Sequence, residues 1–230
     1  MNYLIKLILS LKEIIITYIL QYLIIIISCM IYLKISSKSI AYFINNYCTY
    51  ILIITYIIFI IYLYKKNKIK EKKTNYKKVF IYISLGISLS CILNMIIFMF
   101  YKPTITNKIP PLLLLISSGI IGPIYEEILF RYVFYNKIRK LNSANHAILL
   151  NTLIFALIHL TIRKITFTFL LGLIINIVYE KNKNITYPII IHMSANIISL
   201  LLYNYEKGIL VLAIFLFLIS LINIKEDLWK

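Results

Sequence analysis

The stretch Ile120-Ile-Gly-Pro-Ile-Tyr-Glu-Glu-Ile-Leu-Phe-Arg131 places two adjacent carboxylates inside a segment that is otherwise typical of a membrane-spanning helix. A charged side chain at the bilayer centre costs at least ~2.5–3.5 kcal/mol on insertion scales. The chain has only eight acidic residues, and we expect Glu126 and Glu127 alone to lie well inside an apolar segment. Ionisable groups at membrane depth are functional-site candidates, so the residues that pair with these carboxylates are candidates as well.

The composition of the chain indicates a membrane protein. It has 230 residues, of which 61% are hydrophobic. A soluble domain of this size cannot bury so much apolar surface, so we expect an all-α, polytopic membrane helical bundle that forms one integral membrane domain over residues 1–230. The net charge of +17 comes from lysines gathered in short loops. Such clusters favour contact with anionic lipids, and no nucleic acid is expected as a partner.

Apolar runs of about 20 residues can cross the hydrocarbon core, and the runs in this chain predict about eight transmembrane helices. Their approximate bounds are 14–33, 40–64, 79–101, 111–134, 145–162, 165–180, 186–204 and 208–224. The only unusual polar groups fall between the fourth and seventh runs. The chain therefore divides into N-terminal spans without diagnostic motifs, a motif-bearing core, and a last span with its tail, over 1–105, 110–204 and 205–230.

Positive charge predicts the orientation of these spans. With eight spans, the segments on the side of the N-terminus hold 18 lysines and arginines, and the opposite side holds seven. Cytoplasmic loops carry the excess of Lys and Arg, so both termini are predicted to be cytoplasmic in a bacterial-type cell membrane. In this arrangement Glu13 lies in a polar flank before the first span, and Ser143 is a plausible N-cap of the fifth.

Helical spacing suggests how the polar groups are arranged. Residues four apart share one helix face, so His192 and Asn196 point the same way, and Glu127 and Arg131 are able to pair. Glu126 lies about 100° around the helix from Glu127 and is left free. We expect Arg131 to hold and neutralise Glu127, while Glu126 faces a cavity formed by the fourth, fifth and seventh spans.

These residue types suggest hydrolysis. An apolar pocket makes a glutamate a stronger base, so Glu126 is able to take a proton from water that attacks an amide carbonyl. His159 in the fifth span is a candidate to orient this water, and His192 and Asn196 are candidate donors to the developing oxyanion. One Glu and two His, here Glu126, His159 and His192, also form a familiar zinc ligand set with an open position for water. Both chemistries stay open from the residues alone.

Other classes of protein use similar residues. A proton-coupled transporter would use Glu126 and the buried histidines as a relay, although the sequence shows no internal repeat. A non-proteolytic immunity or scaffold protein would keep the same groups for stability. Each polar residue taken alone is a common helix-packing group. The joint occurrence of carboxylates and two histidines in separate apolar spans of one half of the chain favours a site.

Three motifs in chain order carry a resemblance to a known family. They are Glu126-Glu127-x-x-x-Arg131, Phe155-x-x-x-His159 and His192-x-x-x-Asn196. Together they resemble the signature motifs of the CAAX-protease and bacteriocin-processing family, also called CPBP or Abi intramembrane proteases. The likeness covers about 110–204, which would make this region a protease core.

The resemblance implies a membrane-embedded endopeptidase with a peptide substrate and membrane lipids as its surroundings. It implies that Glu126 and His159 activate water and that His192 and Asn196 stabilise the oxyanion. Glu127 and Arg131 would support the site. Members of the family remove the last residues of prenylated proteins or serve in bacteriocin self-immunity and peptide maturation. They are often described as metalloproteases, so a divalent metal such as zinc is a possible cofactor.

The sequence departs from the family pattern at two positions, and the predicted spans raise one conflict. Tyr132 and Asn176 stand where glycine is expected, which puts bulk between helices. The bounds of spans four and five place Glu126 and His159 at depths that differ by about 14 Å. We therefore expect both hydrocarbon windows to lie later, near 117–137 and 148–166. Gly122-Pro123 is also expected to loosen the helix and free carbonyl groups toward the cavity.

Overall fold

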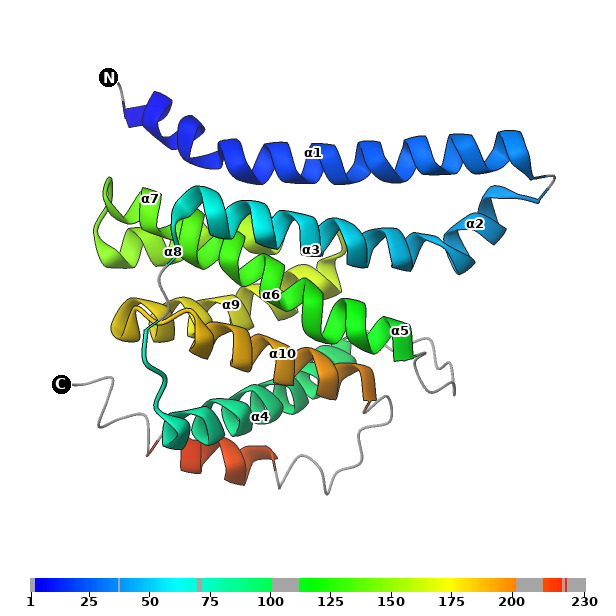
Figure 1. Cartoon of the computed structure of the whole chain (residues 1–230). Helices are drawn as coiled ribbons and strands as arrows, with labels where there is room; N and C mark the ends of the chain where they lie inside the picture. Colours follow the sequence, from blue (N-terminus) through cyan, green and yellow to red (C-terminus); the bar gives the residue numbers. More distant parts are fainter. Residues whose placement is uncertain are drawn as a thin grey trace.

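The computed structural model describes residues 3–36, 38–69, 72–100, 112–201, 213–220 and 222, and these ranges contain helices and no strand. This confirms the predicted all-α polytopic bundle (Figure 1). The helices are α1 Tyr3–Ile35, α2 Ile40–Asn46, α3 Cys48–Asn67, α4 Tyr76–Phe100, α5 Leu112–Leu114, η1 Leu115–Ile121, α6 Gly122–Glu127, η2 Ile128–Tyr135, α7 Asn136–Arg139, α8 Ala144–Leu157, α9 Ile162–Asn182 and α10 Thr186–Leu201.

Five of the described helices are long and apolar enough to cross a membrane. They are α1, α3, α4, α9 and the continuous helix Leu112–Arg139, which comprises α5 to α7. Two shorter apolar helices, α8 and α10, complete the core of the bundle. In the predicted last span 208–224, residues 213–220 are helical, whereas 208–212, 221, 223 and 224 lie outside the described residues. The total of eight crossings therefore stays a prediction.

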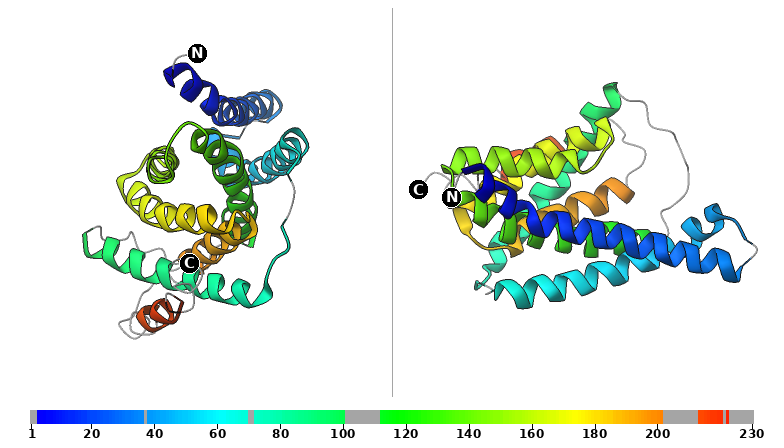
Figure 2. Two further views of the ribbon diagram at one scale, coloured as in Figure 1. Left: turned by 90° about the vertical axis from the view of Figure 1, so that its left-hand side faces the viewer. Right: turned by 90° about the horizontal axis from the view of Figure 1, so that it is seen from above.

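The helix Leu112–Arg139 is central to the bundle (Figure 2). Its segments η1, α6 and η2 contact α3 and α1 in the N-terminal half, and α8 and α10 in the C-terminal half. Helix α10 in turn packs closely on α4, where a Cβ at Gly86 would lie only 2.4 Å from the carbonyl oxygen of Ile191. The residues that carry the motifs are thus enclosed by helices from both halves of the chain.

The predicted boundaries of spans five and six are wrong. Helix α8 ends at Leu157 and α9 begins at Ile162, because Leu160 adopts the left-handed region at φ 60° and breaks the helix. With 14 residues, α8 is ~21 Å long, which is shorter than the ~30 Å hydrocarbon core. The chain therefore turns back at membrane depth. The expected shift of span five to 148–166 is not observed, whereas span four does extend later, to Arg139.

The predicted second span, 40–64, consists of two helices. Ser39 caps α2 by accepting a hydrogen bond from the Tyr42 N–H. The helix is interrupted at Tyr47, and α3 begins at the next residue. Rings of Tyr32, Tyr42, Phe43 and Tyr47 pack together there, which joins α1 to the short α2. The predicted N-cap of α8 is confirmed, since the Ser143 hydroxyl accepts a hydrogen bond from the backbone of that helix.

The placement of Glu13 in a polar flank is also wrong. Glu13 lies inside α1 and is only 4% exposed. Its carboxylate pairs with the ammonium group of Lys66 in α3 at 2.6 Å, and the Tyr62 hydroxyl lies 3.5 Å away. The Glu13 carboxylate can be buried because Lys66 of another helix pairs with it, and this partner is not evident from the sequence around Glu13.

This pair leads to a first prediction. Lys66→Ala should lower the free energy of unfolding by about 1–3 kcal/mol, because the buried Glu13 carboxylate loses the ammonium group with which it pairs. Thermal unfolding of the purified protein in detergent measures this change. Lys65→Ala is the matched control, since Lys65 is exposed and neighbours Lys66. Equal melting temperatures for the two variants would contradict the assigned pair.

Contacts also join the basic segments that were assigned to one side of the membrane. The Tyr3 hydroxyl donates to the Asn142 side chain at 2.8 Å, and Arg139 pairs with Glu180 at 3.0 Å. The ends of α1, α7 and α9 therefore meet at one end of the bundle, as their alternation requires. That this end is cytoplasmic stays a prediction.

Candidate active site

The helix that carries the two glutamates is widened on both sides of them. The segments η1 and η2 have π-helical hydrogen bonding, and in η1 the Gly122 N–H donates to Ser117 O, five residues earlier. Gly122 has no Cβ at this point, and one would lie 2.9 Å from that same oxygen. π-Helical turns inside α-helices occur frequently at functional sites.

Glu127, Arg131 and His192 form a buried charged cluster. The Glu127 Oε1 atom lies 3.1 Å from Arg131 Nη1 and 2.7 Å from His192 Nδ1. Glu127 and Arg131 are fully buried, and His192 is 2% exposed. The expected Glu127–Arg131 pair is therefore present, and His192 adds a contact to Glu127 that the sequence did not suggest. Glu127 links the fourth apolar segment to α10 through this imidazole.

The Phe155 ring packs against this cluster. Its ring lies 4.2 Å from the Arg131 guanidinium carbon and meets the rings of His159 and His192 edge-on at 5.2 and 5.8 Å. Gly172 lets α9 pack closely against the side chains of Phe155 and Arg131, because a Cβ there would lie 3.3 Å from Phe155 and 3.4 Å from Arg131. Phe155 thus sets the spacing between the two imidazoles and the arginine.

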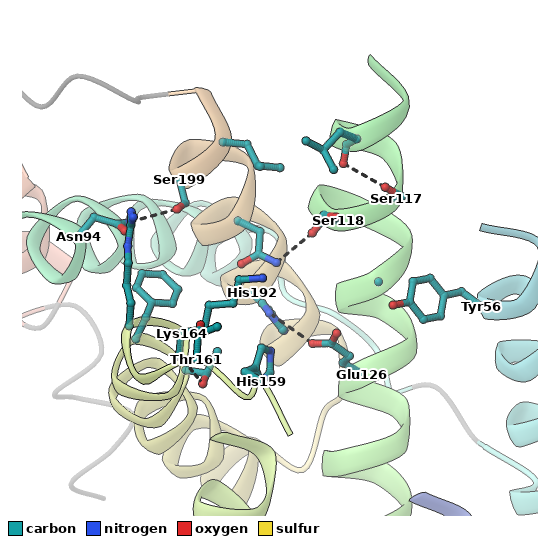
Figure 3. Close-up of a pocket in the computed structure, with 17 residues that line it drawn as sticks. Tyr56, Asn94, Ser117, Ser118, Glu126, His159, Thr161, Lys164, His192 and Ser199 are labelled. Atoms are coloured by element: carbon teal, nitrogen blue, oxygen red, sulfur yellow. Dashed lines mark hydrogen bonds and ion pairs between the residues drawn. The ribbon is translucent and has the colours of Figure 1, made fainter. Parts of the chain in front are cut away.

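Glu126 points into a cavity, toward His192 and away from the buried Glu127–Arg131 pair (Figure 3). Its side chain is 17% exposed, and its Oε2 atom lies 3.8 Å from His192 Nε2. His192 therefore lies between the two carboxylates, with Nδ1 toward Glu127 and Nε2 toward Glu126. The predicted division, in which Glu127 is held and Glu126 is free, matches this geometry.

His159 lies just after α8, in the turn, and not within a helix as expected. Its Nδ1 atom is 2.9 Å from the carbonyl oxygen of Phe155. A carbonyl oxygen only accepts hydrogen bonds, so Nδ1 carries the proton and Nε2 of the neutral ring has a free lone pair. The second imidazole of the cavity is thereby held ready to accept a proton or a hydrogen bond from water.

Asn196 is fixed by a backbone group of η1. Its Nδ2 atom donates to Ser118 O at 2.9 Å. Helix α10 approaches η1 closely at this point because Gly119 has no side chain, and a Cβ there would lie 3.1 Å from Ile197. Asn196 and His192 line the same cavity, as their spacing predicted.

The cavity has a volume of about 760 Å³ and includes all four residues predicted to be catalytic, namely Glu126, His159, His192 and Asn196. It is not formed by three spans alone. Tyr56 of α3, Asn94 of α4 and Lys164 of α9 also line it. Asn94 is an amide inside an apolar run, which is a weak signal in the sequence, and Tyr56 is one of 20 tyrosines and carries no such signal.

The structure accommodates the two departures from the family pattern in different ways. Asn176 is fully buried and donates from Nδ2 to the Thr152 hydroxyl at 2.8 Å, which ties α9 to α8. Tyr132 is half-buried, and its side chain packs against the apolar core. Neither side chain lines the cavity.

The sequence also suggested a zinc site at Glu126, His159 and His192. Among the described residues, no three His, Cys, Asp or Glu side chains are grouped closely enough to hold a metal ion. The Nδ1 atoms of His192 and His159 contact the Glu127 carboxylate and a backbone carbonyl, and such contacts are also common for histidines that bind a metal through Nε2. A metal site at Glu126, His159 and His192 therefore stays a prediction.

Comparison with known proteins supports the relationship suggested by the motifs. Residues 108–198 match the family model described as type II CAAX prenyl endopeptidase Rce1-like. This segment resembles the CAAX proteases. The resemblance inferred from the three motifs is confirmed for the part of the chain that carries Glu126, His159 and His192.

Two curated proteins are similar over a similar length. The "Membrane-embedded CAAX protease MroQ" of Staphylococcus aureus (strain USA300) is 36% identical over 98 residues, which is 40% of this chain and 39% of MroQ. The "Putative membrane peptidase YdiL" of Bacillus subtilis (strain 168) is 30% identical over 86 residues, or 37% of this chain and 35% of YdiL. The matches thus span little more than a third of these relatives. No solved structure matches the chain significantly.

Proposed function

We propose that this protein is an intramembrane endopeptidase that hydrolyses a peptide bond with water activated by Glu126 and His159. The observation that carries the proposal is that four polar side chains from three separate parts of the chain line one cavity within an apolar bundle. A membrane peptidase function also agrees with the names of both curated relatives.

The proposed reaction begins with a water molecule between the Glu126 carboxylate and the free Nε2 of His159. The water oxygen attacks the carbonyl carbon of the peptide bond, and its proton moves to Glu126. The carbonyl oxygen becomes an oxyanion, which accepts hydrogen bonds from Asn196 and from His192 when Nε2 of that ring is protonated. The carbon–nitrogen bond then breaks, and the leaving amine takes the proton from Glu126, which restores the carboxylate.

Glu127 and Arg131 would support this chemistry without touching the substrate. Glu127 holds the His192 ring through Nδ1, so that Nε2 faces the cavity. Arg131 balances the buried charge of Glu127 and packs on Phe155. Such outer contacts fix the orientation of the groups that act on the reacting atoms.

The surroundings of the cavity favour an apolar or lipidated peptide as substrate. The helices around the site expose many large apolar side chains, which suits contact with membrane lipids. A peptide that is itself membrane-bound would reach the site sideways through the lipid. We propose peptide maturation or bacteriocin self-immunity as the biological setting, by analogy with the family that the motifs resemble.

A test of this function uses His159→Ala. Its rate of peptide cleavage should fall about 100-fold or more, because the lone pair that orients the attacking water is lost. Purified wild-type and variant proteins are reconstituted in liposomes with a mass-encoded library of apolar and lipidated peptides, and products are identified by mass spectrometry. His146→Ala is the matched control, because His146 is exposed and absent from the cavity. It should cleave like the wild type.

The same liposomes separate the competing functions. Proton flux driven by a pH gradient, without any peptide product, would favour the transporter. Divalent metal measured in the wild-type protein at one ion per chain, and lost in both His159→Ala and His192→Ala, would favour the zinc set. Binding of a peptide without its cleavage across the whole library would favour an immunity or scaffold protein and would contradict the proposal.

A further inference from the structure

The carbonyl group of Ser118 has lost both of the partners that a helix offers. In an α-helix it would accept from the N–H of Gly122, four residues later, but that N–H donates to Ser117 O. In a π-helix it would accept from the residue five positions later, which is Pro123. Proline has no N–H group. The π-turn and the proline together therefore leave this oxygen free.

The free carbonyl is taken up by Asn196. The Asn196 Nδ2 atom donates to Ser118 O at 2.9 Å, although 78 positions separate the two residues. Ser118 is exposed on the helix and Asn196 is half-buried, so the Asn196 amide competes with water for this oxygen and the bond gives a modest net stabilisation. Because the carbonyl oxygen only accepts, the nitrogen of the amide must face it, and the amide cannot turn over.

Orientation of this amide matters for the site. An amide nitrogen carries two protons, and only one is used by Ser118 O. The other remains for the cavity that Asn196 shares with His192 and Glu126. Figure 3 shows Ser118 on the same side of the cavity as Glu126, facing His192. A donor held by a rigid backbone group needs no reorientation when charge develops on a substrate oxygen.

We propose that Pro123 is a positioning residue, which keeps the Ser118 carbonyl free so that it fixes the Asn196 amide as a preset donor. Pro123 acts through Asn196 and has no contact with the substrate. The effect on turnover rests on the proposed function, whereas the coupling between Pro123 and Asn196 does not.

Pro123→Ala tests the idea, because alanine supplies the N–H that competes for Ser118 O. The variant should lower kcat about tenfold with KM unchanged, and Asn196→Ala should lower kcat by about 100-fold or more. In the Asn196→Ala background, Pro123→Ala should change kcat less than about twofold, because the group through which it acts is gone.

Thermal unfolding tests the bond without reference to activity. Asn196→Ala should lower the melting temperature of otherwise wild-type protein clearly more than that of the Pro123→Ala variant, since alanine already satisfies the carbonyl. Asn151→Ala is the matched control, because Asn151 Nδ2 donates to another carbonyl of the same long helix, Phe130 O, at 2.8 Å, away from the cavity. Its effect should be the same in both backgrounds.

Different results would overturn the Asn196–Ser118 hydrogen bond, the positioning role of Pro123 and the proposed function. Equal effects of Asn196→Ala on melting in both backgrounds would overturn the assigned bond, whether or not the protein cleaves peptides. A melting difference together with an unchanged kcat in Pro123→Ala would overturn the positioning role. Absence of any cleavage by the wild-type protein would be a failure of the proposed function, and the melting comparison would still decide the bond.

Discussion

Glu126→Gln is expected to lower the rate of peptide cleavage by about 10²–10⁴-fold while the protein accumulates in the membrane as the wild type does. Glutamine has the same shape as glutamate but cannot take up the proton of the attacking water. The side chain faces the cavity, where it is 17% exposed, and makes no ion pair with Arg131. Its replacement therefore removes a base without leaving a buried charge alone.

Turnover in liposomes, measured at saturating peptide, gives the effect on kcat, and immunoblots of membrane fractions give the amount of protein. Glu180→Gln is the matched control. Its carboxylate pairs with Arg139 and Lys183, and none of these residues lines the cavity. This variant should cleave within about twofold of the wild type. Undiminished turnover in Glu126→Gln would remove the base from the proposed mechanism.

Helical periodicity was sufficient to predict the relations within each element. Spacing of four residues placed Glu127 beside Arg131 and set His192 and Asn196 toward one cavity, as the structure shows. The hydropathy of the chain likewise predicted a helical membrane bundle. These relations depend on local geometry, which the order of residues fixes.

Relations between elements were harder to predict. The contact of His192 with Glu127 joins residues 65 positions apart, and the contact of Glu13 with Lys66 joins residues 53 positions apart. Helical periodicity predicts which face of its own helix a residue occupies, but not which side chain of a neighbouring helix packs against that face. The sequence therefore assigned Glu13 to a polar flank, although a basic side chain from another helix allows the carboxylate to be buried.

The early end of α8 shows a second limit. Hydropathy runs on past Leu157, but Leu160 in the left-handed conformation ends the helix there. A leucine at this position gives no warning, since such conformations favour glycine or asparagine. The predicted conflict of depths is nevertheless absent, because Glu126 and His159 line the same cavity and the helix of Glu126 extends to Arg139, beyond its predicted end at 134.

Glu127→Ala is expected to cost about 3–5 kcal/mol of stability, the typical loss when one member of a buried ion pair is removed. Arg131 is fully buried, and its guanidinium nitrogens have no well-aligned hydrogen-bond acceptor among the described residues. The nearby carboxylate of Glu127, at 3.1 Å, is thus its main compensation beside the ring of Phe155. The melting temperature should fall by about 10 °C.

A double variant separates charge from structure in this cluster. Glu127→Gln with Arg131→Met removes both charges at similar volume, so its melting temperature should recover most of the loss seen in Glu127→Ala. Cleavage should remain impaired in the double variant, because His192 no longer has a carboxylate to hold Nδ1. A double variant that melts as low as Glu127→Ala would show that the stability comes from shape and not from the paired charges.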